Sequence, residues 1–183
     1  MTTLAETLDA LLDPGSRQPI DVPRRPAAGE YAESLQRAAS RSGVDESVQV
    51  AVAEVNGHRV VVIGGEFGFL AGSVGHSAAD RVVAAYRRAT AERLPVITLP
   101  TSGGTRMQEG TAAFFRMTDI ARAAHEHLAS GAVRIGWLRN PTTGGVMVRS
   151  TVKWGRSTST VSSASRGRRM RNRAGHTTSW LPR

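Results

Sequence analysis

One pattern repeats along the middle of the chain and restricts its fold more than any other feature. A β-rich apolar run, a glycine-rich loop and then a helix follow one another. The apolar runs are residues 59–63, 95–99 and 133–138, and the glycine loops that follow them are 64–75, 102–105 and 142–146. Helical periodicity follows the first two loops, over about 77–92 and 107–129. Such alternation predicts an α/β protein in which helices pack on a sheet.

The segments around this pattern also carry local signals. The apolar run that begins at Val48 is separated from residues 59–63 by Asn56-Gly57, which predicts a β-hairpin. Residues 3–12 form an amphipathic helical pattern, with Thr3 and Glu6 at capping-box spacing. A proline-rich loop over 15–30 and a polar helix over about 31–42 follow. We therefore expect two short helices before the sheet begins.

The helix expected over 77–92 has a second capping-box candidate, Ser77 with Asp80. Its spacing places an apolar stripe, including Tyr86, toward the core. The same spacing leaves Arg81 and the neighbouring arginines on the solvent side.

The positive charge of the chain is concentrated at its C-terminal end. The formal net charge is +9, but residues 151–183 hold seven Arg, one Lys and no acid, so the rest has sixteen basic and fifteen acidic residues. This segment also lacks helical or strand periodicity, which predicts a disordered basic tail. Nucleic-acid binding through the tail is a remote alternative, because aromatic residues are sparse there.

Several classes of site are disfavoured by the residues present. The chain has no cysteine, so disulfides and thiolate metal sites are excluded. The single lysine lies in the tail, so no phosphate-binding GxxxxGK[ST] loop exists. His125 and His127 are two residues apart and do not share a helix face, so we expect a solvated helix end and no metal. No apolar run reaches the length of a membrane span, and we expect a cytoplasmic protein.

The glycine loops are the strongest candidate site. Glycine lets a ligand approach the backbone closely, and a helix N-terminus adds oriented amides with a partial positive charge. Such loops stabilise phosphates or the oxyanion that develops on a thioester carbonyl. They also serve simply as tight turns, and the loops alone do not separate these two interpretations.

Four motifs in a fixed order resemble those of the carboxyltransferase beta subunits of biotin-dependent acyl-CoA carboxylases. Residues 65–75 (GEFGFLAGSVG) are similar to EFxFxGGSxG, and residues 92–95 read ERLP. Residues 102–110 (SGGTRMQEG) resemble SGGxRMQEG, and 141–146 read PTTGGV. The resemblance covers about residues 45–148. It implies the ClpP/crotonase-like fold of repeated ββα units and transfer of CO2 from carboxybiotin to an acyl-CoA such as acetyl- or propionyl-CoA.

The resemblance also assigns roles to particular residues. Gly144 and Gly145 match the amide pair that holds the acyl oxyanion, and Gly103 and Gly104 match a second glycine pair in the same pocket. Gly72 with Ser73 matches the loop near the CoA. Arg106, Gln108 and Glu109 match motif positions for which we expect a structural role. No metal is expected.

The implied partners are a carboxyltransferase alpha-type half, a biotin carboxylase and a biotin carboxyl carrier protein, within an oligomer. Carboxybiotin on that separate carrier and a CoA thioester are the implied co-substrate and substrate. The resemblance implies acetyl-CoA, or another short acyl-CoA, as the acceptor, giving malonyl-CoA for fatty acid biosynthesis, and the GGTRMQEG and PTTGGV forms favour the carboxylase. A malonate decarboxylase beta subunit, another crotonase-fold acyl-CoA enzyme and an inactive relic stay open as alternatives.

The pattern of the family stops near residue 149. Beyond it the chain reads MVRSTVKWG and then the Arg- and Ser-rich tail, where the family continues with further core motifs. We therefore expect an N-terminal segment over 1–44, the first half of a carboxyltransferase domain over 45–149 and a non-homologous tail over 150–183. This departure predicts a truncation or frameshift after about residue 149.

Overall fold

The computed structural model describes residues 3–142 and the backbone of 158–162. Its six strands form one mixed sheet in the order β1-β2-β3-β4-β5-β6. The strands are β1 (Gln18–Pro19), β2 (Val48–Val55), β3 (His58–Gly65), β4 (Val96–Leu99), β5 (Arg134–Leu138) and β6 (Thr158–Ser162). The first three strands are antiparallel, and β3 to β6 run parallel. The predicted α/β class is confirmed.

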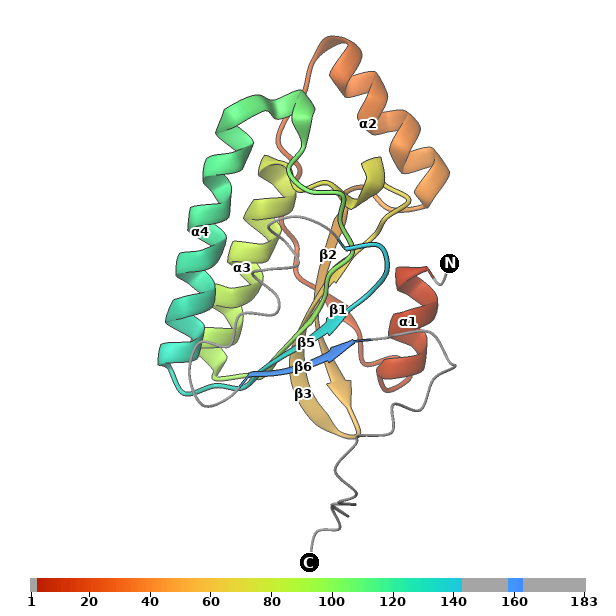
Figure 1. Ribbon diagram of the computed structural model, residues 1–183. Coiled ribbons are helices and arrows are strands. Elements are labelled where there is room, and N and C mark those ends of the chain that lie inside the picture. Colours follow the sequence, from red (N-terminus) through yellow and green to blue (C-terminus); the bar gives the residue numbers. More distant parts are fainter. Residues whose placement is uncertain (1–2, 143–157, 163–183) are drawn as a thin grey trace, which may run out of the picture.

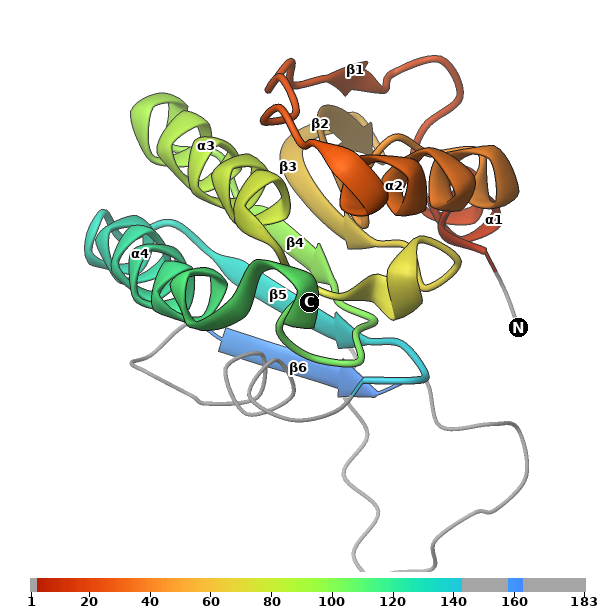
Figure 2. The ribbon, with the colours of Figure 1, turned by 90° about the horizontal axis from the view of Figure 1, so that it is seen from above.

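The described residues form four α-helices that pack around this sheet. They are α1 (Leu4–Leu11), α2 (Gly29–Ser42), α3 (His76–Glu92) and α4 (Gly110–Ala129). Helices α3 and α4 lie side by side on one face, and α1 lies on the other (Figures 1 and 2). Short 3-10 turns, η1 (Leu70–Gly72) and η2 (Met107–Glu109), precede α3 and α4. The order β2–β3–α3 is one ββα unit, as expected.

Alternation along the strands divides the core between the two faces of the sheet, because successive side chains point to opposite sides. Val61 and Ile63 of β3 pack with α3 and α4, whereas Val60 and Val62 pack with α1. Residues 3–12 thus cover one face of the sheet. A third cluster joins α2 to Phe69 in the first glycine loop. The N-terminal segment is therefore packed against the domain.

The local signals of the first hairpin and helix are confirmed. Val55 pairs with His58, and the turn residues Asn56 and Gly57 have φ of 51° and 75°. Thr3 and Glu6 form the capping box of α1, with each side chain accepting the other's backbone N–H.

Two details of α3 differ from the expectation. Its N-cap is Gly75, and Ser77 accepts the backbone N–H of Arg25 at 3.0 Å, so Ser77 and Asp80 do not form a capping box. Arg81 is buried, 8 % exposed, and its guanidinium pairs with Asp45 and donates to the carbonyl of Val48. Helical spacing located Arg81 on a polar face, but the chain before β2 covers that face.

Strand β6 is a further difference, since it lies within the segment for which no regular structure was predicted. Its backbone pairs with β5 in parallel, with Arg134 opposite Thr158 and Leu138 opposite Ser162. The edge of β5 presents backbone N–H and C=O groups that any extended segment can pair with, whatever its side-chain pattern. Residues 158–162 thus form a strand although their sequence carries no strand periodicity.

Candidate functional site

The first two glycine loops lie side by side and are joined by backbone hydrogen bonds. The Gly103 N–H donates to the Ala71 carbonyl at 2.8 Å, and the Val74 N–H donates to the Gly104 carbonyl at 2.9 Å. The Arg106 N–H then donates to the Val74 carbonyl at 3.0 Å. These contacts bring together two loops that the sequence separates by about 30 residues. The 71–75 and 102–105 loops therefore converge in the fold.

The beginning of the third loop reaches the same place. Asn140–Pro141 is a cis peptide, and the Pro141 carbonyl accepts the Ser102 N–H at 3.0 Å. Thr142 forms a parallel bridge with Ser102, and its hydroxyl donates to the Pro100 carbonyl at 3.0 Å. Gly144 and Gly145 follow Thr142 in the sequence but lie outside the described residues.

The four candidate amides that are described all have partners within the protein. Gly72 donates to Phe69 at 2.8 Å and Ser73 donates to Leu70 at 3.1 Å, which closes η1. Gly103 donates to Ala71, and Gly104 donates to the Ser102 hydroxyl at 3.0 Å. We expected amides open to a ligand, and in this structure these N–H groups instead hold the loops together. Their role in binding substrate stays a prediction.

Gly72 has a steric reason for being glycine. Its φ is +64°, and a Cβ atom there would overlap the carbonyl oxygen of Thr101. An L side chain is strained at that φ even without the overlap. The close contact of the two loops therefore depends on this residue.

A buried arginine fastens both loops to the sheet. The Arg106 side chain is fully buried and forms an ion pair with the Glu46 carboxylate, which is buried as well. It also donates to the Ser73 carbonyl at 2.8 Å and to the Ser47 hydroxyl at 3.2 Å. Burial acts to lower the pKa of Arg106, but the hydrogen bond and charge of Glu46 outweigh it and raise that pKa. The guanidinium is therefore a fixed cation.

Glu109 occupies the N-terminus of α3. Its carboxylate accepts the His76 N–H at 2.5 Å and also accepts the Tyr31 hydroxyl. Burial and this hydrogen bond to Glu109 raise the pKa of Tyr31 to about 12, so the phenol stays protonated. A helix N-terminus favours an anion, and here the protein supplies its own. The expected structural role of Arg106 and Glu109 agrees with these contacts.

Sequence reasoning missed the partners of Arg106 and Glu109. Glu46 and Tyr31 lie 60 and 78 residues from the groups that they contact. An acid two residues before a buried strand was a usable signal for Glu46, because a charge at such a position needs a partner. No comparable signal marked Tyr31.

The histidines do not form a metal site in the part of the chain that the structure describes, where no group of three candidate ligands occurs. His58 is exposed. His127 is fully buried, so the prediction of a solvated helix end is wrong for it. It packs against Tyr86 with ring centroids 5.8 Å apart, because this side of α4 faces α3. Burial lowers the pKa of His127. No helix within residues 3–142 is long and apolar enough to cross a membrane.

Comparison with known proteins places the chain in a family. The sequence profile of the family described as carboxyl transferase domain matches residues 1–151, so the match includes the N-terminal segment as well as the glycine loops. The probable biotin-dependent acyl-coenzyme A carboxylase beta3 subunit of Mycobacterium tuberculosis is 48 % identical over 151 residues. That alignment covers 80 % of this chain and 29 % of the relative. The chloroplastic acetyl-coenzyme A carboxylase carboxyl transferase subunit beta of Pyropia yezoensis is 34 % identical over 148 residues, covering 77 % and 51 %.

Solved structures share the fold. Transcarboxylase 12S superposes with a TM-score of 0.66 at 23 % identity, covering 81 % of this chain and 28 % of that one. A Pseudomonas malonate decarboxylase MdcD-MdcE hetero-dimer chain gives a TM-score of 0.62 at 19 % identity, covering 81 % and 57 %. The chain thus spans between about a quarter and a little over half of the proteins it matches. Since the family profile covers most of its length, the chain belongs to the carboxyl transferase domain family.

Proposed function

We propose that this chain is part of the carboxyltransferase component of a biotin-dependent acyl-CoA carboxylase. In this proposal CO2 passes from carboxybiotin, carried by a separate protein, to the α-carbon of a short acyl-CoA. Acetyl-CoA is the favoured substrate, giving malonyl-CoA for fatty acid biosynthesis. The observation that carries the proposal is the meeting of the 71–75 and 102–105 loops with Thr142, the first residue of the third loop.

The place where the 71–75 and 102–105 loops meet fits a thioester because it is made of backbone and small side chains. Gly103 is exposed, and beyond Ala71 its Cβ position meets no atom within 4 Å. A CoA ester can therefore approach the main chain without displacing a side chain. Carboxybiotin, when bound, supplies the CO2 that joins the acyl α-carbon.

In this proposal the backbone N–H groups of Gly144 and Gly145 hold the oxyanion of the thioester. The amides of Gly103 and Gly104 already donate within the protein and form the adjoining wall. Backbone N–H groups stabilise negative charge on a thioester oxygen without a change in protonation. Loss of one such donor lowers kcat by a factor of about 10²–10³.

The partners belong to the proposal as well. An alpha-type half, a biotin carboxylase and a carrier protein complete the reaction in the resembling enzymes, and we infer the same partners and a cytoplasmic location here. The solved transcarboxylase 12S is described as a hexamer assembly, which supports an oligomeric enzyme.

The reverse reaction, in which a carboxyl group passes from a carboxylated CoA ester to free biotin, tests the function without the carrier protein. The chain, reconstituted with an alpha-type half, is incubated with malonyl-CoA or methylmalonyl-CoA, with and without biocytin as a free biotin donor. We expect biocytin-dependent release of acetyl-CoA or propionyl-CoA, measured by liquid chromatography with mass detection. The preferred ester identifies the acyl specificity.

A matched pair of glycine variants locates the site. Gly145→Pro removes one amide N–H, and we expect kcat to fall by about 10²–10³. Gly15→Ala alters an exposed turn with open space around it and should keep full activity. Product formation without biocytin would instead favour a malonate decarboxylase type of activity, and absence of product from both esters would contradict the proposal.

A further inference from the structure

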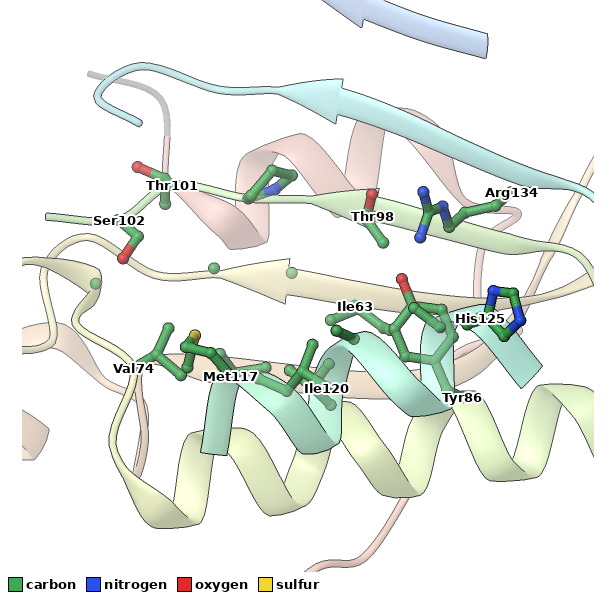
Figure 3. A pocket seen from close by; sticks show the side chains of 18 of the residues that line it. Ile63, Val74, Tyr86, Thr98, Thr101, Ser102, Met117, Ile120, His125 and Arg134 are labelled. Atoms are coloured by element: carbon green, nitrogen blue, oxygen red, sulfur yellow. The ribbon is translucent and has the colours of Figure 1, made fainter. Parts of the chain in front are cut away.

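An apolar cavity of about 520 Å³ lies between α4 and the sheet (Figure 3). Its walls include Ile63 of β3, Tyr86 of α3, and Met117 with Ile120 of α4. The volume falls within the range of about 300–1,000 Å³ that is usual for small-molecule sites. The cavity is therefore large enough for a ligand.

The helical side of the cavity is a continuous stripe. Met117, Ile120, Ala124 and Leu128 line it at spacings of three and four residues, which places them on one face of α4. Alanine at positions 121 and 124 keeps this face from filling the gap to the sheet. The space is thus a consequence of small residues on the buried side of α4.

One end of this apolar space holds a buried cation. Arg134 of β5 is only 8 % exposed and lines the cavity, and Figure 3 shows it at the same end as Tyr86 and His125. Thr101 and Ser102 lie at the opposite end. Within residues 3–142, the ion pairs do not include Arg134. Burial raises the pKa of Tyr86, and the charge and hydrogen bond of Arg134 oppose that rise, so the two groups are neighbours.

This arrangement differs from that of two other buried arginines of the protein, Arg81 and Arg106. Arg81 and Arg106 are each paired with a carboxylate, Asp45 and Glu46 respectively. A buried guanidinium without an anion loses hydration that only a counter-charge replaces well. An anion beside Arg134 would restore the pairing that the other two already have.

We propose that the cavity binds an unbranched carboxylate amphiphile of medium chain length. The carboxylate pairs with Arg134 beside the Tyr86 hydroxyl, and the alkyl chain lies along the α4 stripe toward Met117. Apolar walls accept the chain, and a single buried cation at one end sets its direction. The cavity shares Gly72 and Ser102 with the candidate site, but ligand binding in it does not depend on carboxyl transfer, so either proposal can fail alone.

Titration calorimetry of the full chain with octanoate and decanoate, each below its micelle concentration, tests the site. We expect saturable binding of one ligand per chain, tightening by about fourfold per added CH2. Decanol, which has the same chain length and no charge, should bind at least tenfold more weakly than decanoate.

Three variants assign the binding to this cavity. Arg134→Met should weaken decanoate binding at least tenfold and leave decanol binding within about twofold. Arg87→Met removes an exposed arginine from the outer side of α3 and should change neither. Ala121→Phe fills the cavity and should abolish binding of both ligands.

Circular dichroism confirms that each variant is folded. If Arg134→Met does not fold, the comparison of decanoate with decanol and the Ala121→Phe variant still decide the matter. Equal binding of decanoate and decanol, unchanged binding in Ala121→Phe, or no binding to the unaltered chain would each overturn the proposal.

Discussion

Arg106 and Glu46 form an ion pair in which both side chains are fully buried, and this pair joins the second glycine loop to the start of β2. The same guanidinium holds the carbonyl of Ser73 in the first loop. One buried charge pair thus sets the relative position of two loops at the candidate site. The arrangement leads to a direct test of what holds the site together.

Glu46→Gln should destabilise the protein by about 3–5 kcal/mol, because Arg106 would keep its charge in a buried position without a carboxylate. Urea unfolding followed by circular dichroism measures the change. The exposed pair of Arg37 and Glu33 supplies the control, since Glu33→Gln should alter the free energy of unfolding by less than about 1 kcal/mol. Similar losses from both variants would show that Arg106 does not depend on Glu46.

Gly72→Ala should cost more than an ordinary glycine substitution at positive φ. Gly43 has a φ of +72° and open space around its Cβ position, so Gly43→Ala should cost about 1–2 kcal/mol from backbone strain alone. Gly72→Ala adds an overlap with the Thr101 carbonyl and should cost about 1–3 kcal/mol more. Chemical unfolding of both variants gives the difference, and equal losses would contradict the close packing of the two loops.

The burial of His127 predicts a loss of stability in mild acid. Burial lowers the pKa of His127 in the folded protein. In the unfolded chain this histidine has the ordinary pKa of about 6.5 and takes up a proton near that pH. The unfolded state then binds more protons, so the free energy of unfolding falls as the pH drops below about 6.5. The fall ends once the pH is below the folded-state pKa.

His127→Phe should remove this part of the pH dependence, which urea unfolding between pH 7.5 and 5 would measure. His125→Gln, at an exposed position on the same helix, is the matched control and should keep the dependence of the unaltered protein. A pH profile that is the same in all three proteins would show that His127 does not resist protonation.

Local sequence alone determined the class of fold and the hairpin. The Asn56-Gly57 turn, the capping box of Thr3 and Glu6, and the apolar run of β3 each depend on residues close together in the chain. Such features follow from backbone preferences and the period of the side chains, which neighbours in sequence already specify. The ordered glycine motifs likewise indicated the family before the fold was known.

Only the tertiary structure decided which polar groups are buried and what they contact. Arg81 and His127 lie on helix faces that the spacing assigned to solvent, and distant segments cover both. The amides of Gly103 and Gly104 took partners within the protein because the loops pack against one another. Periodicity describes one element at a time, whereas a buried charge or amide is satisfied by whichever residue the completed fold brings within hydrogen-bond distance.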